Sequence, residues 1–498
     1  MPEHLRQCFN IDTEDDSFFK GRCLPFTRSD AICSMNDPRD QINGLGSFID
    51  TSMVYGSDET TARKLRTLNG GLMKTHQLGP SLPTRNQAQF DSAHNLHPED
   101  LVAGDTRAIE HPGLSSMHSL FVNEHNRLAL ILQDHTPNLS DEEIYQNVRK
   151  IVGAEIQNIV YTEFLPLVLG NTTVHNYHLD LPLDLMENTN YNEQTDATVT
   201  NEFATVAFRF GHSLIPSILT PALDPIRTTL MTCPLRHHFF EFDEFVLGAD
   251  MSGNAWKNML LGMQSQQSPA MDASMSNSVI DFLFCEDNCE IPEGFGQDLA
   301  ARNIQRARDH GLPGYMEFRR YCKLDVTENW DAKPENIEQE LWVSMKAIYN
   351  NVDDIDPFTG GMSEDPIEGG LIGAMFACII GEQFKRLKDG DRFFFTHPDK
   401  GSKHEMGLPA KVKAAVRRRR LGDILCDNTD AVTTADLVMQ ISGEETNCTK
   451  KPKLLYEDIV DLISQPSTDN SIILHKLHNI ISQILVPVLL KTLIFYQS

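Results

Sequence analysis

The segment LVAGDTRAIEHPGLSSMHSLFVNEHNR spans residues 101–127 and opens the clearest helical pattern in the chain. Its apolar side chains recur at helical spacing and continue beyond it, which predicts an amphipathic α-helix beginning near residue 114. The apolar stripe consists of Leu114, Met117, Phe121, Leu128 and Leu132. Arg107 and Glu110 lie just before this stripe, and they share one face if the segment is helical. Spacing alone favours a surface ion pair beside the helix.

The surrounding sequence predicts a mainly α fold. Ser140 and Glu143 form the capping-box pattern that starts a helix, and this helix is expected to continue through KIVGAEIQNIVYTEF toward Pro166. Strand signals are short and scattered, and residues 450–498 change in composition, which indicates a C-terminal extension. Further helices are predicted near residues 201–217, 296–310, 335–350, 369–387 and 409–422.

The net charge argues against several classes of partner. The 498 residues include 43 Lys or Arg and 70 Asp or Glu, which gives a formal net charge of −27. Because phosphate binding needs clustered positive charge, nucleic acids and anionic membranes are unfavourable partners. The run RRRR at 417–420 is the exception, and we interpret it as a solvated helix face. The apolar tail after Ile472 is interrupted by Pro487 and Lys491, which favours a poorly packed extension over a membrane anchor.

Signals for secretion are weak when they are taken residue by residue. The first residues, MPEHLRQCFN, lack the apolar core of a signal peptide. Acceptor patterns for N-glycosylation occur at Asn138, Asn171 and Asn447. Ten cysteines permit disulfides but are too few for a cysteine scaffold, and Cys285 and Cys289 have no completing set of metal ligands.

Two further segments place polar side chains on helical faces. In NEFATVAFRFGHSLI (201–215), helical spacing puts one group of residues toward a core and sets Phe208, Arg209 and His212 on another face. In DLAARNIQRARDHGLPGY (298–315), Asn303 and Arg306 share a face, and the GLP sequence ends the helix. The first group consists of Phe203, Ala207, Phe210 and Leu214.

Histidines in such segments have two possible roles. His212 would be a neutral imidazole between aromatic neighbours, and a lone histidine there is more often a core residue than a ligand. His118 and His125 lack the spacing of a zinc-protease motif, so a packing or hydrogen-bonding role is favoured for them.

These three segments, in this order and with these spacings, resemble the animal haem peroxidase family. The resemblance spans roughly residues 8–449 and implies a large, mainly helical domain over 1–449 with few short strands, incomplete at its N-terminus, and a haem b cofactor. It also includes QINGLGSFIDTSMVYGS (41–57), KIVGAEIQNIVYTEFLPLVLG (150–170), FACIIGEQFKRLKDGDRFFF (376–395) and ILCDNTD (424–430).

The resemblance assigns a role to each site residue. His212 matches the axial ligand of the haem iron, and Asn303 matches the residue that accepts a hydrogen bond from the other ring nitrogen. Arg107 matches the arginine that stabilises charge as the peroxide O–O bond breaks. Glu110 matches a glutamate that forms an ester with haem, and Arg209 matches an arginine that pairs with a haem propionate. A structural ion pair is the alternative for Arg209.

The family's calcium site and disulfides also have counterparts. Phe48, Asp50 and Ser52 match part of the calcium site, and calcium binds carboxylate, hydroxyl and carbonyl oxygens of this kind. Family disulfides are matched by Cys322 with Cys378 and by Cys426 with Cys448. Disulfides persist in oxidising compartments, so these pairs imply a secreted protein.

The chain departs from the family at its front. The family's distal histidine precedes the cysteine matched by Cys8, and this chain begins too late to include it. That histidine moves the peroxide proton, and losing such a group costs roughly 10²–10⁴-fold in rate. Cys8 and Cys23 match cysteines whose usual partners lie upstream in the family, so they either pair with each other or stay free. Secretory features without a signal peptide suggest an incomplete chain, and we therefore expect the natural protein to contain residues before Met1. Gly46 replaces a calcium-ligating threonine, and His111 replaces a methionine that one member links to haem.

The resemblance therefore implies a peroxidase that uses hydrogen peroxide to oxidise small electron donors or halides. The alternative is a catalytically impaired, peroxidase-like extracellular interaction protein, which the missing distal segment favours. A haem-dependent fatty-acid oxygenase is a third possibility, but it would need a channel tyrosine that the sequence does not place.

Overall fold

The structure is a computed structural model that carries side chains. The expectations for Cys8 and for the tail after Ile472 fall outside the residues it describes. Within those residues, no helix is both long and apolar enough to cross a membrane. The described residues are 9–32, 39–90, 97, 99–182, 191–241, 243–249, 252–285, 289–290, 295–397, 408–440 and 444–463.

Helices dominate the architecture, as the sequence predicts. The first half of the chain contains α1 (Ser52–Tyr55), α2 (Glu59–Leu65), α3 (Arg85–Ala88), α4 (Pro112–His135), α5 (Asp141–Ile159), α6 (Leu165–Asn176) and α7 (Asn201–Thr205). The second half contains α8 (Ala255–Met263), α9 (Asn277–Ile280), α10 (Leu299–Asp309), α11 (Tyr315–Tyr321), α12 (Gln339–Ile348), α13 (Pro357–Met362), α14 (Ala374–Asp389), α15 (Ala410–Arg417), α16 (Leu421–Asn428) and α17 (Tyr456–Ile459).

Short irregular helices and two small sheets complete the fold. Strand β1 (Ile218–Leu219) pairs antiparallel with β2 (Cys233–Pro234), and β3 (Thr433–Ala435) pairs antiparallel with β4 (Glu445–Asn447). The 3₁₀ helices are η2 (Thr106–Ile109), η4 (Ala207–Leu214), η5 (Leu235–His237), η7 (Val352–Asp354), η8 (Cys448–Lys450) and η9 (Val460–Leu462). The π-helical turns are η3 (Val160–Phe164) and η6 (Asp243–Leu247).

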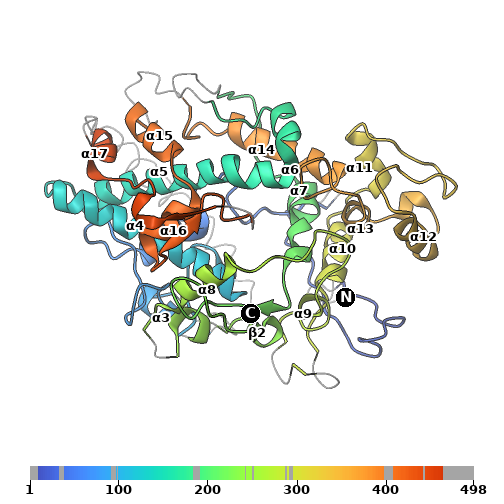
Figure 1. The fold of residues 1–498 in the computed structure, drawn as a ribbon. Helices are drawn as coiled ribbons and strands as arrows, with labels where there is room; N and C mark the ends of the chain where they lie inside the picture. Colours follow the sequence, from blue (N-terminus) through green and yellow to red (C-terminus); the bar gives the residue numbers. More distant parts are fainter. Residues whose placement is uncertain are drawn as a thin grey trace, which may run out of the picture.

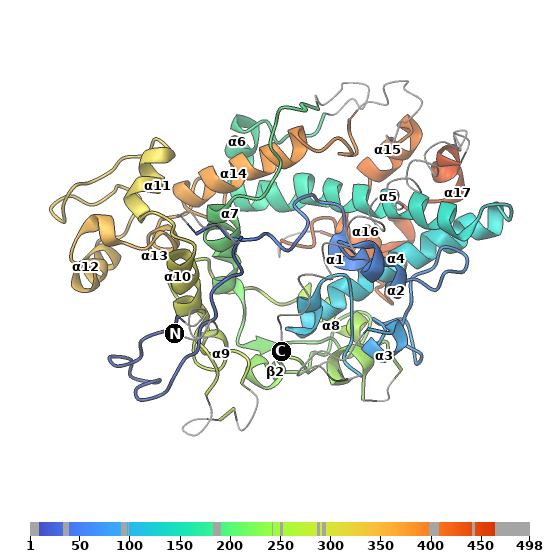
Figure 2. The same ribbon diagram turned by 180° about the vertical axis from the view of Figure 1, so that it is seen from behind.

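The long helices form the centre of an elongated molecule (Figures 1 and 2). Helix α4 packs against α5, α8 and α16, whereas α14 packs against α6, α7 and η4. Helices α11 and α12 lie at one end of the molecule, and α15 and α17 lie toward the other. Side chains from most of these helices share one large apolar core, so elements far apart in sequence are held in one body.

The two helices predicted with most detail are present, with local differences. On α4, Phe121, Leu128 and Leu132 are buried, but Leu114 is 42% exposed at the start of the helix. The Ser140 hydroxyl accepts a hydrogen bond from the Glu143 backbone N–H, and the Glu143 carboxylate accepts one from the Ser140 N–H. The capping box at the start of α5 is therefore confirmed.

The helical run after α5 does not end near Pro166. Helix α5 passes into the π turn η3, which leads directly into α6, and Pro166 lies in the first turn of α6. Backbone N–H groups in the first turn of a helix have no acceptor within the helix. Proline, which lacks this N–H, is therefore well tolerated there. The wider π turn allows the chain to start a new helix there.

The segment predicted as one helix over 201–217 is divided. Helix α7 ends at Thr205, Val206 adopts φ −127° and ψ −76°, and the chain continues as the 3₁₀ helix η4. Because a 3₁₀ helix has about three residues per turn, Arg209 and His212 share one row. Phe208 lies on another row and stacks on Phe203, with ring centroids 4.6 Å apart. The expected placement of Phe208 beside His212 is therefore wrong.

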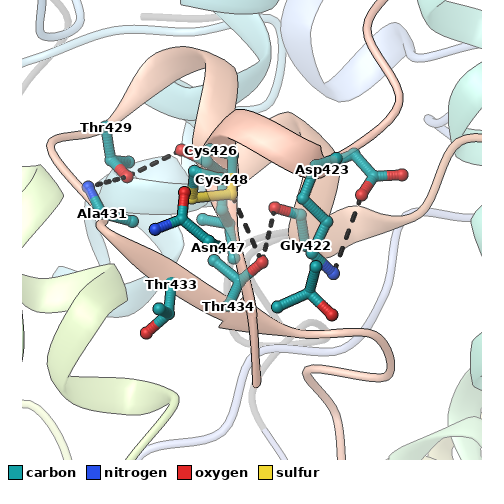
Figure 3. Close-up of a disulfide and its surroundings, with 12 residues drawn as sticks. Gly422, Asp423, Cys426, Thr429, Ala431, Thr433, Thr434, Asn447 and Cys448 are labelled. Atoms are coloured by element: carbon teal, nitrogen blue, oxygen red, sulfur yellow. Dashed lines mark hydrogen bonds and ion pairs between the residues drawn. A yellow bond between two sulfur atoms is a disulfide. The ribbon is translucent and has the colours of Figure 1, made fainter. Parts of the chain in front are cut away.

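Three disulfides join the described residues. The two expected pairs, Cys322–Cys378 and Cys426–Cys448, are both present. Figure 3 shows the second pair, where the Thr434 hydroxyl lies 3.4 Å from Cys426 Sγ and donates to the Gly422 carbonyl. Cys285 and Cys289, for which the sequence showed no completing set of metal ligands, form the third disulfide.

The RRRR run at 417–420 is not a solvated helix face. It covers the end of α15 and the turn before α16, and Arg419 is only 1% exposed. Arg419 donates to Glu124 on α4, to Glu155 on α5 and to Asp427 on α16, at 3.0, 3.1 and 2.6 Å. We call these four residues, with Arg127, the Arg419 cluster. Long-range ion pairing, which the sequence pattern does not show, draws the guanidinium into the core.

Part of the C-terminal extension packs onto the same core. Leu454 and Ile459 are buried, and Lys451 forms an ion pair of 2.6 Å with Asp436. Residues 464–498 lie outside the description, so the expected division at residue 449 stays a prediction.

His125 makes the fold sensitive to acid. Its ring is buried among Tyr55, Tyr145, Arg66 and Arg149 from other segments and Glu124 from its own helix, and burial is the main cause that lowers its pKa from 6.5 to about 4. Between pH 6.5 and about 4, His125 is protonated in the unfolded chain but stays neutral in the folded chain. The free energy of unfolding therefore decreases as the pH falls through this interval. The stability contribution of His125 is fully present only above the unfolded pKa.

We predict that a His125→Gln variant loses less stability over this pH interval than the parent chain. The difference in slope should reach up to about 1.4 kcal/mol per pH unit, because one proton is no longer linked to unfolding. Urea unfolding at a series of pH values measures both slopes. Parallel slopes in the two proteins would contradict the assignment.

Candidate functional site

The imidazole of His212 is held by one residue of α10. Asn303 is fully buried, and its amide Nδ2 lies 2.8 Å from His212 Nδ1. Helix α10 is positioned for this contact by Asp298, whose side chain accepts the Ala301 N–H at the start of the helix. Burial is the main cause that lowers the pKa of His212 to about 4, and the Arg209 cation adds to it. The ring is therefore neutral, and no described residue bonds its Nε2 atom.

Arg209 is a cation without a carboxylate partner among the described residues. Its Nη1 donates to Asn303 Oδ1 at 3.0 Å and its Nε donates to the Ala204 carbonyl at 3.1 Å. Burial, together with repulsion from Arg306, Arg107 and Arg302, lowers its pKa to about 10. The structural ion pair left open by the sequence is thus not formed in this part of the chain. A half-buried guanidinium surrounded by like charges is a strong site for an anion.

The polarity of the Asn303 contact is the reverse of the expected one. The amide nitrogen faces the imidazole and donates to it, because the amide oxygen is occupied by Arg209. In this arrangement the imidazole proton resides on Nε2. A half-turn of the amide would allow it to accept from Nδ1, but Nδ2 would then face the Arg209 guanidinium. Arg209 must therefore find another acceptor before Asn303 can accept from His212.

Arg107 pairs with a residue that the sequence analysis missed. It donates from Nε and Nη2 to the carboxylate of Asp105, at 3.0 and 2.6 Å, and its side chain is 56% exposed. Asp105 also accepts the Arg107 backbone N–H at the start of η2. The surface ion pair is thus formed with Asp105 and not with Glu110. An aspartate immediately before a helix start is the signal that could have identified it.

Glu110 lies close to the same pair. Burial raises its pKa, Arg107 lowers it and Asp105 raises it again, and the net shift is upward. The carboxyl group therefore holds its proton more readily than an exposed glutamate. Arg107, Glu110 and Asp105 form one polar group at the start of α4.

Arg107 at the start of α4 lies close enough to Arg209 on η4 for their charges to interact. Their repulsion helps to lower the pKa of Arg209. Both views place α7 and α10 on one side and α8, which packs on α4, on the other (Figures 1 and 2). The fold thus brings together Arg107, Arg209, His212 and Asn303 from three separate segments.

The predicted calcium residues lie in a turn before α1. Asp50 Oδ1 accepts the Ser52 N–H at 2.9 Å, and Phe48 is exposed. Asp391, which the sequence analysis did not single out, is raised in pKa to about 6 by burial and by the charge of Asp50. Among the described residues there is no cluster of three His, Cys, Asp or Glu side chains able to hold a metal.

His125 and His118 have hydrogen-bonding roles. His125 contacts Tyr55 and the Gly71 carbonyl through its two ring nitrogens, as the sequence interpretation favours. His118 Nδ1 lies 2.7 Å from the Leu114 carbonyl.

Comparison with protein families and curated proteins gives consistent matches. The family model described as animal haem peroxidase matches residues 1–439. Myeloperoxidase from Mus musculus is 36% identical over 457 residues, which cover 87% of this chain and 60% of that protein. Peroxidase mlt-7 from Caenorhabditis elegans is 32% identical over 453 residues, covering 88% of this chain and 56% of that protein. Peroxidasin homolog pxn-1 from the same organism is 33% identical over 459 residues, or 86% of this chain and 34% of that protein.

The solved structures agree with these matches. Peroxidase A from Dictyostelium discoideum has a TM-score of 0.70 at 29% identity, covering 86% of this chain and 82% of that chain. A fatty acid alpha-dioxygenase from Oryza sativa has a TM-score of 0.60 at 23% identity, covering 78% of this chain and 65% of that chain, which shows a shared fold alone. The chain spans between about a third and three fifths of the length of the curated relatives above.

Proposed function

The chain belongs to the animal haem peroxidase family, and from this premise we propose that it binds haem b through His212 and uses hydrogen peroxide to oxidise small electron donors or halides. The observation that carries the proposal is the unpaired Arg209 beside an imidazole whose Nε2 has no partner among the described residues. The family implies haem, and its relatives myeloperoxidase and peroxidasin support a secreted location for this chain.

The residues on η4 and α10 fit a metalloporphyrin. Arg209 offers a guanidinium to a propionate carboxylate, and pairing would relieve the repulsion from Arg302 and Arg306. If Arg209 paired with that carboxylate, the Asn303 amide would be free to rotate and accept a hydrogen bond from His212 Nδ1–H. With its proton on Nδ1 instead of Nε2, His212 would have a free Nε2 lone pair with which to hold the haem iron. Anion pairing by Arg209 and iron ligation by His212 would therefore be coupled through the Asn303 amide.

The residues at the start of α4 would serve the other side of the cofactor. When bound, haem iron supplies the redox chemistry with peroxide. Arg107 would be the cation that stabilises negative charge on the departing oxygen, and its ion pair with Asp105 would orient it. We propose that Glu110 is the residue that would be ester-linked to a haem methyl group. Forming that bond from a carboxylic acid and a C–H bond removes two electrons and two protons, so hydrogen peroxide would be the oxidant.

The coupling through Asn303 makes a specific prediction for two variants. Asn303→Leu removes the acceptor for His212 Nδ1–H and should weaken haem binding by about 10–100-fold. Asn303→Asp keeps an acceptor and also offers Arg209 a charge, so the haem complex should form and its iron should shift to a more negative potential. Haem titration and spectroelectrochemistry measure these effects. Equal haem affinity in the parent and Asn303→Leu proteins would contradict the coupling.

We propose that calcium binds the turn containing Phe48, Asp50 and Ser52. The charge of Asp50 already raises the pKa of Asp391, and a bound cation would relieve this repulsion. We expect added calcium to raise the melting temperature, and EDTA to reverse the change. The Asp50→Asn variant should show a much smaller response, whereas an exposed acid such as Glu193 can be changed to Gln as the control. A full calcium response in Asp50→Asn would disprove the site.

The experiment for the proposed function separates cofactor binding from turnover. Purified chain is titrated with haem while the Soret band is followed, and peroxide-dependent oxidation of guaiacol is then measured on the same complex. Saturable binding with turnover above that of free haem supports the peroxidase. Binding without turnover would favour the catalytically impaired interaction protein, and the absence of saturable binding would reject both the ligand assignment and the enzyme.

A further inference from the structure

Tyr55 and His125 form a buried hydrogen-bonded pair that the proposed haem site does not use. Tyr55 is the last residue of α1 and is fully buried, and its hydroxyl lies 2.8 Å from Nδ1 of His125 on α4. His125 Nε2 lies 2.8 Å from the Gly71 carbonyl. A carbonyl oxygen only accepts, so the Nε2 atom carries the proton. The Nδ1 lone pair therefore receives the hydrogen bond from the phenol.

We propose that Tyr55 is a proton-coupled redox site, oxidised by one electron to a neutral tyrosyl radical while its phenolic proton moves to His125 Nδ1. The O–H bond of the phenol breaks, an N–H bond forms on the imidazole, and the electron passes to a one-electron oxidant. The products are a phenoxyl radical and an imidazolium ion, and reduction returns the proton along the same hydrogen bond. The proposal rests on the proposed peroxidase function only for its natural oxidant.

The pair is held rigidly, as a reversible proton transfer requires. The Gly71 backbone N–H donates to Asp141 at 2.7 Å, and a Cβ atom on Gly71 would lie only 2.5 Å from the Ile144 side chain. The rings of Tyr55 and His125 meet edge to face with centroids 5.3 Å apart. Both partners of the imidazole are thus fixed before any oxidation occurs.

The surrounding charges make the radical a strong oxidant. Arg149 lies over the Tyr55 ring at 5.3 Å and Arg66 lies over the neighbouring Tyr145 ring at 3.8 Å, and both cations oppose an imidazolium on His125. Glu124 favours it, and burial disfavours both phenolate and imidazolium. The phenol therefore keeps its proton until the electron leaves. These groups come from α4, from α5 and from Arg66, the residue that follows α2, and they enclose the pair.

A short path joins this pair to the polar group at the start of α4. The Asp105 backbone N–H donates to the Met53 carbonyl on α1 at 3.0 Å, and Asp105 is the carboxylate that holds Arg107. A Cβ atom on Gly104 would lie 2.2 Å from the backbone of Ser52, so the segments are in direct contact. Tyr55 is two residues from Met53. An oxidant formed beside Arg107 would thus be connected to Tyr55 through the Asp105–Met53 hydrogen bond and the backbone of α1.

No other tyrosine among the described residues is hydrogen-bonded to an imidazole, and Tyr349 donates to Asp356, a carboxylate that is already paired with Arg308. Tyr161 is buried but donates to the Phe384 backbone carbonyl at 2.6 Å, which is a poor base. Tyr145 is beside Tyr55, with ring centroids 5.8 Å apart, and its hydroxyl has no partner among the described residues. Tyr315 donates to Glu364, whose charge is already paired with Arg319. Tyr161 and Tyr145 are therefore matched controls for burial without a hydrogen bond to an imidazole.

The test uses a photochemical oxidant and therefore needs no haem. Purified chain is illuminated with ruthenium tris-bipyridine and a sacrificial electron acceptor, frozen, and examined by electron paramagnetic resonance. We expect a long-lived tyrosyl signal that falls at least tenfold in Tyr55→Phe and persists in Tyr161→Phe and Tyr145→Phe. In the unaltered chain labelled with ¹⁵N-histidine, the signal should show coupling to one histidine nitrogen.

Each outcome decides the proposal. A signal that persists in Tyr55→Phe, or no long-lived signal at all, would overturn Tyr55 as the redox site. A Tyr55 signal without histidine coupling would overturn His125 as the proton acceptor, and this readout does not depend on the folding of any variant. Because haem is absent from the experiment, failure of haem binding in a separate titration leaves the result intact.

Discussion

Replacing His212 with glycine is expected to lower haem affinity by more than about 100-fold. The loss should exceed that in Asn303→Leu, because His212→Gly removes the proposed iron ligand, whereas Asn303→Leu removes only a group that orients it. The Soret band of the titrated protein should collapse toward that of free haem. Asn303 and Arg209 would remain, so the propionate side of the site is preserved. Added imidazole should enter the vacated volume and restore much of the band.

The control for this variant is a histidine in a comparable environment. His310 also has a pKa lowered to about 4, chiefly by burial, and its ring nitrogens contact Asn201 and Ser29. His310→Gln should bind haem as the parent protein does. An unchanged Soret titration in His212→Gly, or an equal loss in His310→Gln, would show that His212 is not the ligand.

Replacing Arg419 with methionine is expected to destabilise the fold by about 3–5 kcal/mol, which is a large part of the stability of a typical domain. Glu124, Glu155 and Asp427 would be left buried without their shared cation. Glu124 retains Arg127 at 2.6 Å, but in the described structure Glu155 has no other ion pair and one of its carboxylate oxygens has no hydrogen-bond partner. Urea unfolding measures the loss.

The pH dependence and a neighbouring residue test the cause. Burial and the charge of Glu124 raise the pKa of Glu155, so acid neutralises Glu155 readily and should reduce the cost of Arg419→Met. Adding Glu155→Gln to Arg419→Met should likewise recover part of the lost stability. Arg418, the adjacent residue, is 61% exposed and lies 3.7 Å from Asp458, so Arg418→Met should change stability by less than about 0.5 kcal/mol. Equal losses of stability in Arg419→Met and Arg418→Met would mean that the Arg419 cluster is not the cause.

Local signals predicted the helices well where neighbouring residues decide the structure. The capping box at Ser140 and the apolar stripe of α4 depend on contacts within one or two turns, and both are present. The split of residues 201–217 was not predictable in this way. Burial of Val206 and Phe210 against the core overrides the helical pattern there, and the change to a 3₁₀ helix moves Phe208 away from His212.

Motifs supplied the candidate site residues, but they did not reveal the partners of those residues. The sequence alone does not show which of the two arginines, Arg107 or Arg209, is paired. Acids lie near Arg107 along the chain, and an acid and an amide precede Arg209. The folded chain gives Arg107 the carboxylate of Asp105 and leaves Arg209 with only an amide oxygen and a carbonyl. Arg209 thus becomes the stronger anion site. The Tyr55–His125 pair was equally hidden, because its members are 70 residues apart.

The amino-acid sequence by itself determined the family and the mainly helical class, because these depend on residue order and on spacing within single segments. Through the family resemblance it also predicted two disulfides that are present, and it supplied the candidates for the site residues. Only the tertiary structure decided which charges are paired, which are buried and which way Asn303 faces. Arg209 and Asn303 are 94 residues apart, and Glu124 and Arg419 are 295 apart. Pairing and desolvation arise between such distant segments, so no local pattern records them.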